Sequence, residues 1–171
     1  TVGVMGDART YDFALSLLCN VYEGLVRWNA DLEIEPALAE SWEAISDTEW
    51  RFHLRKDVTF HNGKTLTPDD VVFSINLHRG PNTISEAKAL MEQISDVQVS
   101  APDEVTVALV APNAGFPALM ALINMLIVPA DDMEFGKGIG TGGYTLESFE
   151  PGVAARVVRA PNYWKEGRGH F

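Results

Sequence analysis

Three things are scarce in this sequence: cysteine, basic residues and long apolar runs. The one cysteine, Cys19, has no partner for a disulfide within the chain and is expected to pack as a small apolar side chain. The 24 aspartates and glutamates outnumber the 13 lysines and arginines, which argues against a nucleic-acid partner, because such a partner requires a basic face. No apolar run reaches the ~20 residues that cross a bilayer, so we expect no membrane insertion of this segment.

The rest of the composition is that of a folded domain. Hydrophobic residues make up 46% of the 171 residues and charged residues 22%, which excludes wholesale disorder. This length suits one domain or two small lobes. The first residue is Thr1 rather than methionine, as expected of a processed or trimmed chain.

The stretch at residues 22–42 has the most regular local pattern in the first part of the chain. Two short apolar runs flank a polar turn at residues 29–31, which predicts a helix end, a strand, a tight turn and a second strand. Residues 36–42 then predict a compact bend anchored by a tryptophan. Upstream, residues 1–5 are predicted to form a short buried strand, and apolar residues at helical spacing predict a helix over residues 11–22.

The clearest helix start lies at Thr67. Its hydroxyl can cap free N–H groups, and Pro68 suits the first helical position. Asp69 and Asp70 suit the positive end of the helix dipole. The helix is predicted to end at Gly80, which is followed by a proline.

Periodicity and turn residues assign the remaining elements. Alternation predicts a strand at residues 50–54, and the dipeptide Asn62-Gly63 predicts a turn. Strands and helices are therefore interleaved, which predicts the mixed α/β class with α+β character. The other predicted elements are a helix at 85–93, a hairpin of 94–100 with 104–110, a helix at 116–122, a strand at 125–128, a hairpin of 144–149 with 154–160, and an aromatic turn at 161–164.

No arrangement of side chains in the sequence predicts catalysis or metal binding. His53, His61 and His78 lack the close spacing of zinc ligands, so we predict no metal site and no cofactor, and His53 is expected simply to be exposed. The aspartates at 69–70 and 131–132 are assigned to a helix start and a turn. A hydrolase remains an alternative, because sequence spacing cannot show whether two carboxylates meet in space. The chain is nevertheless expected not to be an enzyme.

Glycines crowd into residues 136–143, where a phosphate-binding loop could be suspected. A dinucleotide-binding loop needs a helix after it, whereas a strand is predicted at residues 144–149. We expect the glycines to serve close backbone packing beside a crossover between lobes.

A series of short motifs covers nearly the whole chain. They are YEGLV at residues 22–26, PALAESW at 36–42, FHLR at 52–55, VTFHNG at 58–63, LTPDDVVFS at 66–74, GTGGY at 140–144 and RAPNYW at 159–164. In this order and spacing they resemble the family 5 extracellular solute-binding proteins, which are the peptide, oligopeptide and nickel binding proteins of bacterial ABC importers. One departure is Gly143, where the family usually has proline.

The resemblance implies a type II periplasmic-binding-protein-like fold. Because family members are much longer, the chain would be a partial N-terminal lobe with a mixed sheet and antiparallel hairpins. Residues 24–135 would form an inserted subdomain, residues 1–23 and 136–171 would belong to the main lobe, and the second lobe would be absent.

The function that the resemblance implies is that of the substrate-binding component of an ABC importer. Such a protein is periplasmic or extracellular, captures a peptide or similar small solute between two lobes, and delivers it to a membrane permease. Closure around the ligand requires contacts from both lobes, so one lobe alone is expected to bind weakly or not at all. The alternative is a non-transport sensor or chaperone-like module on the same fold.

The resemblance also implies where the ligand contacts lie. The loop after the first strand would face the interlobe cleft, followed by the start of the helix near residue 85 and the segment before residue 129. Arg9 is a candidate partner for a ligand carboxylate, or else a solvated loop charge. The candidate ligand-binding residues are Gly6, Asp7, Arg9, Tyr11, Thr83, Ser85, Ala87, Asn124 and Met125, and the candidate hinge or structural residues are Gly140, Thr141, Gly142 and Gly143.

Overall fold

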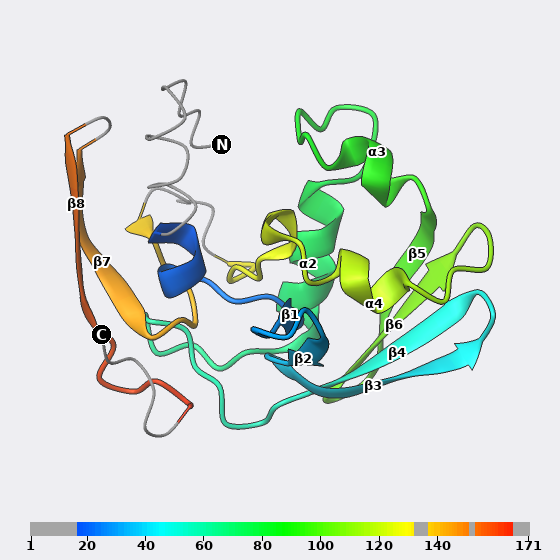
Figure 1. Cartoon of the computed structure of the whole chain (residues 1–171), viewed down its shortest axis with the longest axis horizontal. Coiled ribbons are helices and arrows are strands. Elements are labelled where there is room, and N and C mark those ends of the chain that lie inside the picture. Colours follow the sequence, from blue (N-terminus) through cyan, green and yellow to red (C-terminus); the bar gives the residue numbers. More distant parts are fainter. Residues whose placement is uncertain (1–16, 132–136, 151–152, 166–171) are drawn as a thin grey trace.

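The structure is a computed structural model, and it describes residues 17–131, 137–150 and 153–165 (Figure 1). Its largest unit is a four-stranded sheet in which every neighbouring pair is antiparallel. The strand order is β3-β4-β6-β5, with β3 at Ala39–Ser46, β4 at Glu49–Leu54, β5 at Ile94–Ala101 and β6 at Glu104–Leu109. The mixed α/β class and the antiparallel hairpins are thus confirmed.

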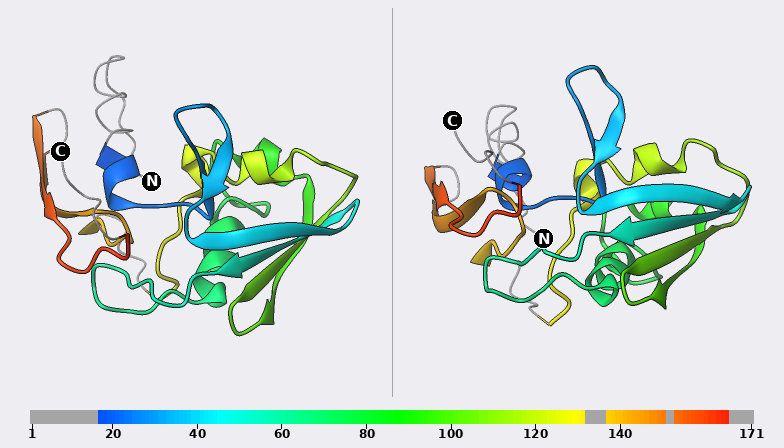
Figure 2. Two further views of the ribbon diagram at one scale, coloured as in Figure 1. Left: turned by 60° about the horizontal axis from the view of Figure 1, so that its bottom comes forward. Right: turned by 90° about the horizontal axis from the view of Figure 1, so that it is seen from below.

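Two separate hairpins flank this sheet. The first pairs β1 (Val26–Trp28) with β2 (Ile34–Pro36), and Figure 2 shows that it stands out from the body of the molecule. The second pairs β7 (Tyr144–Glu150) with β8 (Ala154–Arg159), on the far side of the helical turn formed by residues 17–21 (Figure 1).

Short helices cover the inner face of the four-stranded sheet. The longest of those with described bounds is α2 (Pro68–Leu77), which packs against β5 and β6. The others are α3 (Lys88–Met91), α4 (Phe116–Leu119) and the 3-10 turn η1 (Ile123–Met125). Within the described residues, no helix has both the length and the apolar character that crossing a membrane requires.

Strand β4 shows how sequence alternation builds the core. Phe52 and Leu54 are buried on the inner face, and the Phe52 ring meets that of Phe116 edge-on with 6.3 Å between centroids. Arg51 and His53 alternate with them and lie on the outer face. Because successive strand residues point to opposite sides, one hydrophobic alternation sets both faces of the sheet.

The outer face corrects one expectation. His53 is not merely exposed, because its two ring nitrogens lie 3.6 Å from Glu43 and 3.3 Å from Glu104. Arg51 contacts the same two carboxylates at 3.3 and 3.5 Å. These four residues come from three neighbouring strands, so their proximity could not be read from spacing along the chain.

The sequence also placed several elements wrongly. Residues 39–42, expected as the end of a bend, belong instead to β3, whose pairing with β4 is interrupted by two irregularities in register that blur the alternation. The helix predicted at 85–93 is reduced to α3, because Ser85 uses its hydroxyl to bind the backbone N–H of Ala87 in the preceding loop. The helix predicted at 116–122 ends early as α4, and the strand predicted at 125–128 is a single bridge between Gly24 and Leu126.

Most other elements agree with prediction. The turn at Asn62-Gly63, the start of α2 and the hairpins β5–β6 and β7–β8 are confirmed, whereas α2 ends at Leu77, before the predicted end at Gly80. Residues 17–21 are helical, as predicted, whereas the strand predicted at 1–5 lies outside the described residues.

The start of α2 depends on the buried carboxylate of Asp70. This side chain has no exposed surface, and it accepts hydrogen bonds from the backbone N–H and the hydroxyl of Thr67 at 2.9 and 2.8 Å. Its other oxygen accepts from the ammonium of Lys64 at 2.6 Å and from the N–H of Ala130 at 2.8 Å. The carboxylate therefore ties the helix to two loops, which is more than the helix start predicted from sequence.

We expect Asp70→Asn to lower the free energy of unfolding by about 3 kcal/mol, because it removes one partner of a buried ion pair. Asp69→Asn is the matched control, since Asp69 is exposed on the same helical turn and its loss costs about 1 kcal/mol or less. Urea unfolding monitored by circular dichroism measures both. Equal losses for the two variants would contradict this role of Asp70.

Candidate functional site

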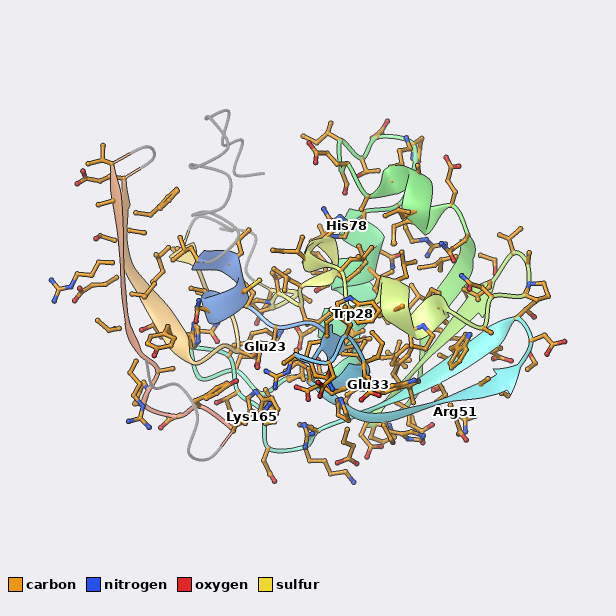
Figure 3. All side chains as sticks on the ribbon, in the orientation of Figure 1. Glu23, Trp28, Glu33, Arg51, His78 and Lys165 are labelled. Carbon is orange, nitrogen blue, oxygen red and sulfur yellow. The ribbon has the colours of Figure 1, made fainter. Side chains whose placement is uncertain are left out.

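A cleft of about 550 Å³ opens where five parts of the chain meet. Its walls come from the end of the first helical turn, from β1, from residues 121–126, from the start of β7 and from the aromatic turn near the C-terminal end. Figure 3 shows the labelled side chains of Glu23, Trp28 and Lys165 in this region, between the β7–β8 hairpin and the four-stranded sheet. We call this feature the cleft.

The charged centre of the cleft is Glu23. One carboxylate oxygen accepts a hydrogen bond from the hydroxyl of Tyr163 at 2.8 Å. The other accepts from the indole N–H of Trp164 at 2.7 Å and from the hydroxyl of Thr141 at 3.1 Å. Burial raises the pKa of Glu23 above its ordinary value, and these three hydrogen bonds, together with the charge of Arg27, oppose the rise.

Cations surround the aromatic part of this site. The guanidinium of Arg55 lies over the ring of Trp164, 4.7 Å from its centroid, and the ammonium of Lys165 lies 5.6 Å from the same centroid. Arg55 also donates from Nε to the carbonyl of Ala37 at 2.7 Å. The indole is thereby held by a carboxylate at its N–H and by cations near its ring, a combination that fixes its orientation.

The rim of the cleft carries an ion pair and an exposed aromatic ring. Arg27 pairs with Glu35 across the β1–β2 hairpin. Trp28, at the end of β1, keeps 46% of its surface exposed, whereas the other three tryptophans pack partly buried against the core. The cleft therefore offers an aromatic surface next to charged groups that already have partners.

Part of the cleft wall, just before the start of β7, is built by the glycine segment, which we define as residues 138–143. A Cβ atom at Gly140 would lie 2.0 Å from the carbonyl oxygen of Val21, and one at Gly142 would lie 2.3 Å from that of Asn20. The N–H of Gly142 donates to the Val21 carbonyl at 3.0 Å. The prediction of close backbone packing is confirmed, and Gly142 and Gly143 line the cleft.

The predicted ligand-binding residues that the structure describes do not line the cleft. Gly6, Asp7, Arg9 and Tyr11 lie outside the described residues. Thr83 donates its hydroxyl to the carbonyl of Leu77 at 2.8 Å, the Ser85 hydroxyl lies 2.6 Å from Nδ1 of His78, and Ala87 is buried in the core. Asn124 is exposed and Met125 buried, beside Ile123 of the cleft wall. None of these five described residues lines the cleft, and their role as ligand contacts stays a prediction.

Sequence reasoning missed Glu23 as a site residue. It stands in the YEGLV motif, which was interpreted as architecture alone. The available signal was an acidic side chain between apolar neighbours at a helix end, since a carboxylate in such surroundings needs donors. Those donors lie 118 to 141 residues further along the chain, so nothing in the sequence named them.

Comparison with known proteins identifies the family. The family described as "Bacterial extracellular solute-binding proteins, family 5 Middle" matches residues 33–171. The chain belongs to this family. The resemblance in the sequence motifs is thereby confirmed, and with it the type II periplasmic-binding-protein fold.

Three relatives show the range of proteins to which this chain is similar. The structure of the binding protein AgaA from A. tumefacien R10, in complex with agropinic acid, superposes with a TM-score of 0.81 at 29% identity and covers 90% of this chain. A nickel ABC transporter from Bacillus halodurans superposes with a TM-score of 0.78 at 28% identity over 88% of this chain. The transcriptional regulator SgrR of Yersinia enterocolitica is 33% identical over 131 residues, or 74% of this chain.

The chain is much shorter than these relatives. It spans 32% of AgaA, 32% of the nickel transporter and 22% of SgrR. What the relatives do as whole proteins therefore enters only as a proposal for this one.

The raised pKa of Glu23 predicts a pH dependence of stability. A carboxyl whose pKa is higher in the folded state contributes stability below its ordinary value of 4.5, and this contribution is lost as the pH rises through the folded value. The stability difference between wild type and Glu23→Gln is therefore expected to shrink as the pH rises above 4.5. Urea unfolding at a series of pH values measures this difference.

Glu33→Gln serves as the control for this series, because it removes the same charge from an exposed position at the tip of the β1–β2 hairpin. The assignment of a raised pKa to Glu23 would be contradicted if the stability difference between wild type and Glu23→Gln grew with pH. It would also be contradicted if that difference equalled the one measured for Glu33→Gln at every pH.

The packing of the glycine segment predicts that Gly140→Ala lowers the free energy of unfolding by about 3 kcal/mol, because the new methyl group overlaps the Val21 carbonyl. Gly115→Ala is the matched control, since its methyl group would meet only the side-chain oxygen of Asn113, at 3.4 Å. Thermal unfolding compares the two. An unaffected Gly140→Ala variant would show that the segment can move away from the helix end.

Proposed function

We propose that this chain is part of the substrate-binding component of an ABC importer, which captures a peptide or similar small solute in an interlobe cleft and delivers it to a membrane permease. The observation that carries the proposal is the family match over residues 33–171. Its setting would be the cell envelope, either periplasmic or extracellular. The role is binding rather than catalysis, in keeping with the family.

The division of the chain into lobes is part of the proposal. Residues 24–135, which include the four-stranded sheet, would form the inserted subdomain, and residues 1–23 and 136–171 would belong to the main lobe. Contacts that cross this boundary support a firm junction. His61 of the subdomain contacts the glycine segment, and Arg55 of the subdomain lies over the ring of Trp164. Glu23 joins the two parts of the main lobe to each other.

The glycine segment would act as a rigid connection, rather than a hinge, at this junction. Gly140 and Gly142 leave no room for a side chain against the helix end, which favours the structural part of the predicted hinge or structural role. Motion between lobes would then be absorbed outside these two residues, because hinges need backbone that is free to rotate.

The ligand contacts would come from the loop at residues 6–11, from residues 83–87 and from residues 124–125, with Arg9 as the partner of a ligand carboxylate. AgaA carries the acidic ligand agropinic acid, and the nickel transporter is named for a metal, so the fold accommodates different solutes. A peptide or similar small solute is the class that this chain's motifs favour.

A sensor is the second candidate function. It is favoured by the 33% identity to SgrR, which is named as a transcriptional regulator. In that case the lobe would bind an effector rather than a transported solute. The net charge of −11 makes this chain itself a poor DNA-binding element, so recognition of DNA would belong to another part of such a protein.

Isothermal titration calorimetry against a panel of dipeptides and oligopeptides tests the proposal. The 171-residue chain is expected to bind at least about 100-fold more weakly than a longer form of the protein with both lobes, since losing one set of contacts costs about 3 kcal/mol. Equally tight binding by the isolated chain would contradict the two-lobed clamp. No binding of any peptide by the longer form would contradict the proposed solute.

A further inference from the structure

The imidazole of His61 contacts the backbone of the glycine segment at three points. Its Nε2 lies 2.9 Å from the carbonyl oxygen of Gly142. Its Nδ1 lies 3.3 Å from the backbone nitrogen of Gly140 and 3.5 Å from the carbonyl oxygen of Gly138. These contacts span 77 to 81 residues of sequence, so the ring joins the turn after residue 60 to a distant segment.

These contacts select one form of the ring. With its proton on Nε2, the neutral imidazole donates to Gly142 and accepts from the N–H of Gly140. With the proton on Nδ1 instead, a lone pair on Nε2 would face the Gly142 oxygen at 2.9 Å, and the Gly140 N–H would lose its acceptor. A doubly protonated ring would also set an N–H against the N–H of Gly140. The neutral form protonated on Nε2 is the only one that satisfies both short contacts.

The backbone of His61 adds a fourth contact, because its N–H donates to the carbonyl of Gly140 at 2.9 Å. Gly140 is therefore held on both its N–H and its C=O by one residue. The next residue, Thr141, donates to Glu23, and the two after it line the cleft. Whatever fixes Gly140 also fixes this wall of the cleft.

We infer that His61 is a positioning residue that sets the glycine wall of the cleft through its neutral ring, with the proton on Nε2. It touches no ligand in this account. A rigid ring with a donor and an acceptor on opposite sides suits two backbone groups that lie two residues apart. An amide side chain can reproduce either the contact with Gly142 or the contact with Gly140, but not both at once. An asparagine variant therefore separates the effects of the two contacts.

The test uses the 171-residue chain labelled with nitrogen-15 in histidine and glycine. Nuclear magnetic resonance at a pH where the ring is neutral is expected to place the ring proton on Nε2. It should also show a coupling across the hydrogen bond between the Gly140 nitrogen and Nδ1 of His61. A ring proton on Nδ1, or absence of this coupling, would overturn the inference.

Three variants supply the functional part of the test. His61→Ala is expected to speed hydrogen exchange of the Gly140 amide about tenfold beyond any global loss of stability, as fits the loss of one hydrogen bond. His61→Asn should restore much of the protection, because its oxygen can take the place of Nδ1. His78→Ala is the matched control, since the described contact of that ring is to Ser85 and not to the glycine segment. Equal exchange rates in His61→Ala and the control would contradict the inference.

The consequence for binding depends on the proposed function. In the longer protein, His61→Ala should weaken solute binding about fivefold and His61→Asn less. If the longer protein binds no solute, the proposed function fails while the resonance data still decide the role of the ring. A third outcome is that the longer protein binds solute and its His61→Ala variant keeps full affinity while the exchange rate of the Gly140 amide changes. In that case the ring holds the wall without influencing the ligand, and the binding part of the inference is wrong.

Discussion

The hydrogen-bonded, partly buried carboxylate of Glu23 is the interaction on which the cleft depends. It stands at the end of the first helical turn, and the three groups that donate to it come from the glycine segment and from the aromatic turn at residues 163–164. A carboxylate removed from water must find donors or give up its charge, so these distant segments are brought to one point.

The other polar contacts at this junction follow the same principle. The buried carboxylate of Asp70 joins α2 to two loops. The ring of His61 joins its turn to backbone groups of the glycine segment, whereas Glu23 joins side chains. Each of these polar groups has at least one partner in a segment far away in the sequence. The apolar core of the four-stranded sheet supplies most of the stability, whereas these groups decide how the remaining segments are placed against it.

How much of this could be read from the sequence depends on the range of the interaction. The start of α2 and the turn at Asn62-Gly63 were predicted because the cap, the proline and the turn residues act within a few positions. Strand β3 was missed because an edge strand with irregular register keeps little alternation. The partners of Glu23, His53 and His61 were missed because only the fold brings them together.

The family could be predicted from the order of short motifs, and the comparisons confirm it. The roles of residues inside those motifs could not, since the same Glu23 and His61 were taken as parts of turns and helix ends. Sequence motifs identify the family that a chain resembles, whereas the role of each residue in a motif is found from its contacts in the structure.

A double-mutant cycle between Glu23 and Trp164 tests the central claim most directly. Glu23→Gln, Trp164→Phe and the double variant are compared by urea unfolding, the phenylalanine keeping an aromatic ring while removing the indole N–H. The sum of the two single losses in the free energy of unfolding is expected to exceed the loss in the double variant by about 1 kcal/mol or more, because the two residues share a hydrogen bond in a partly buried site. Additive losses would show that Glu23 is not the link between the helix end and the aromatic turn.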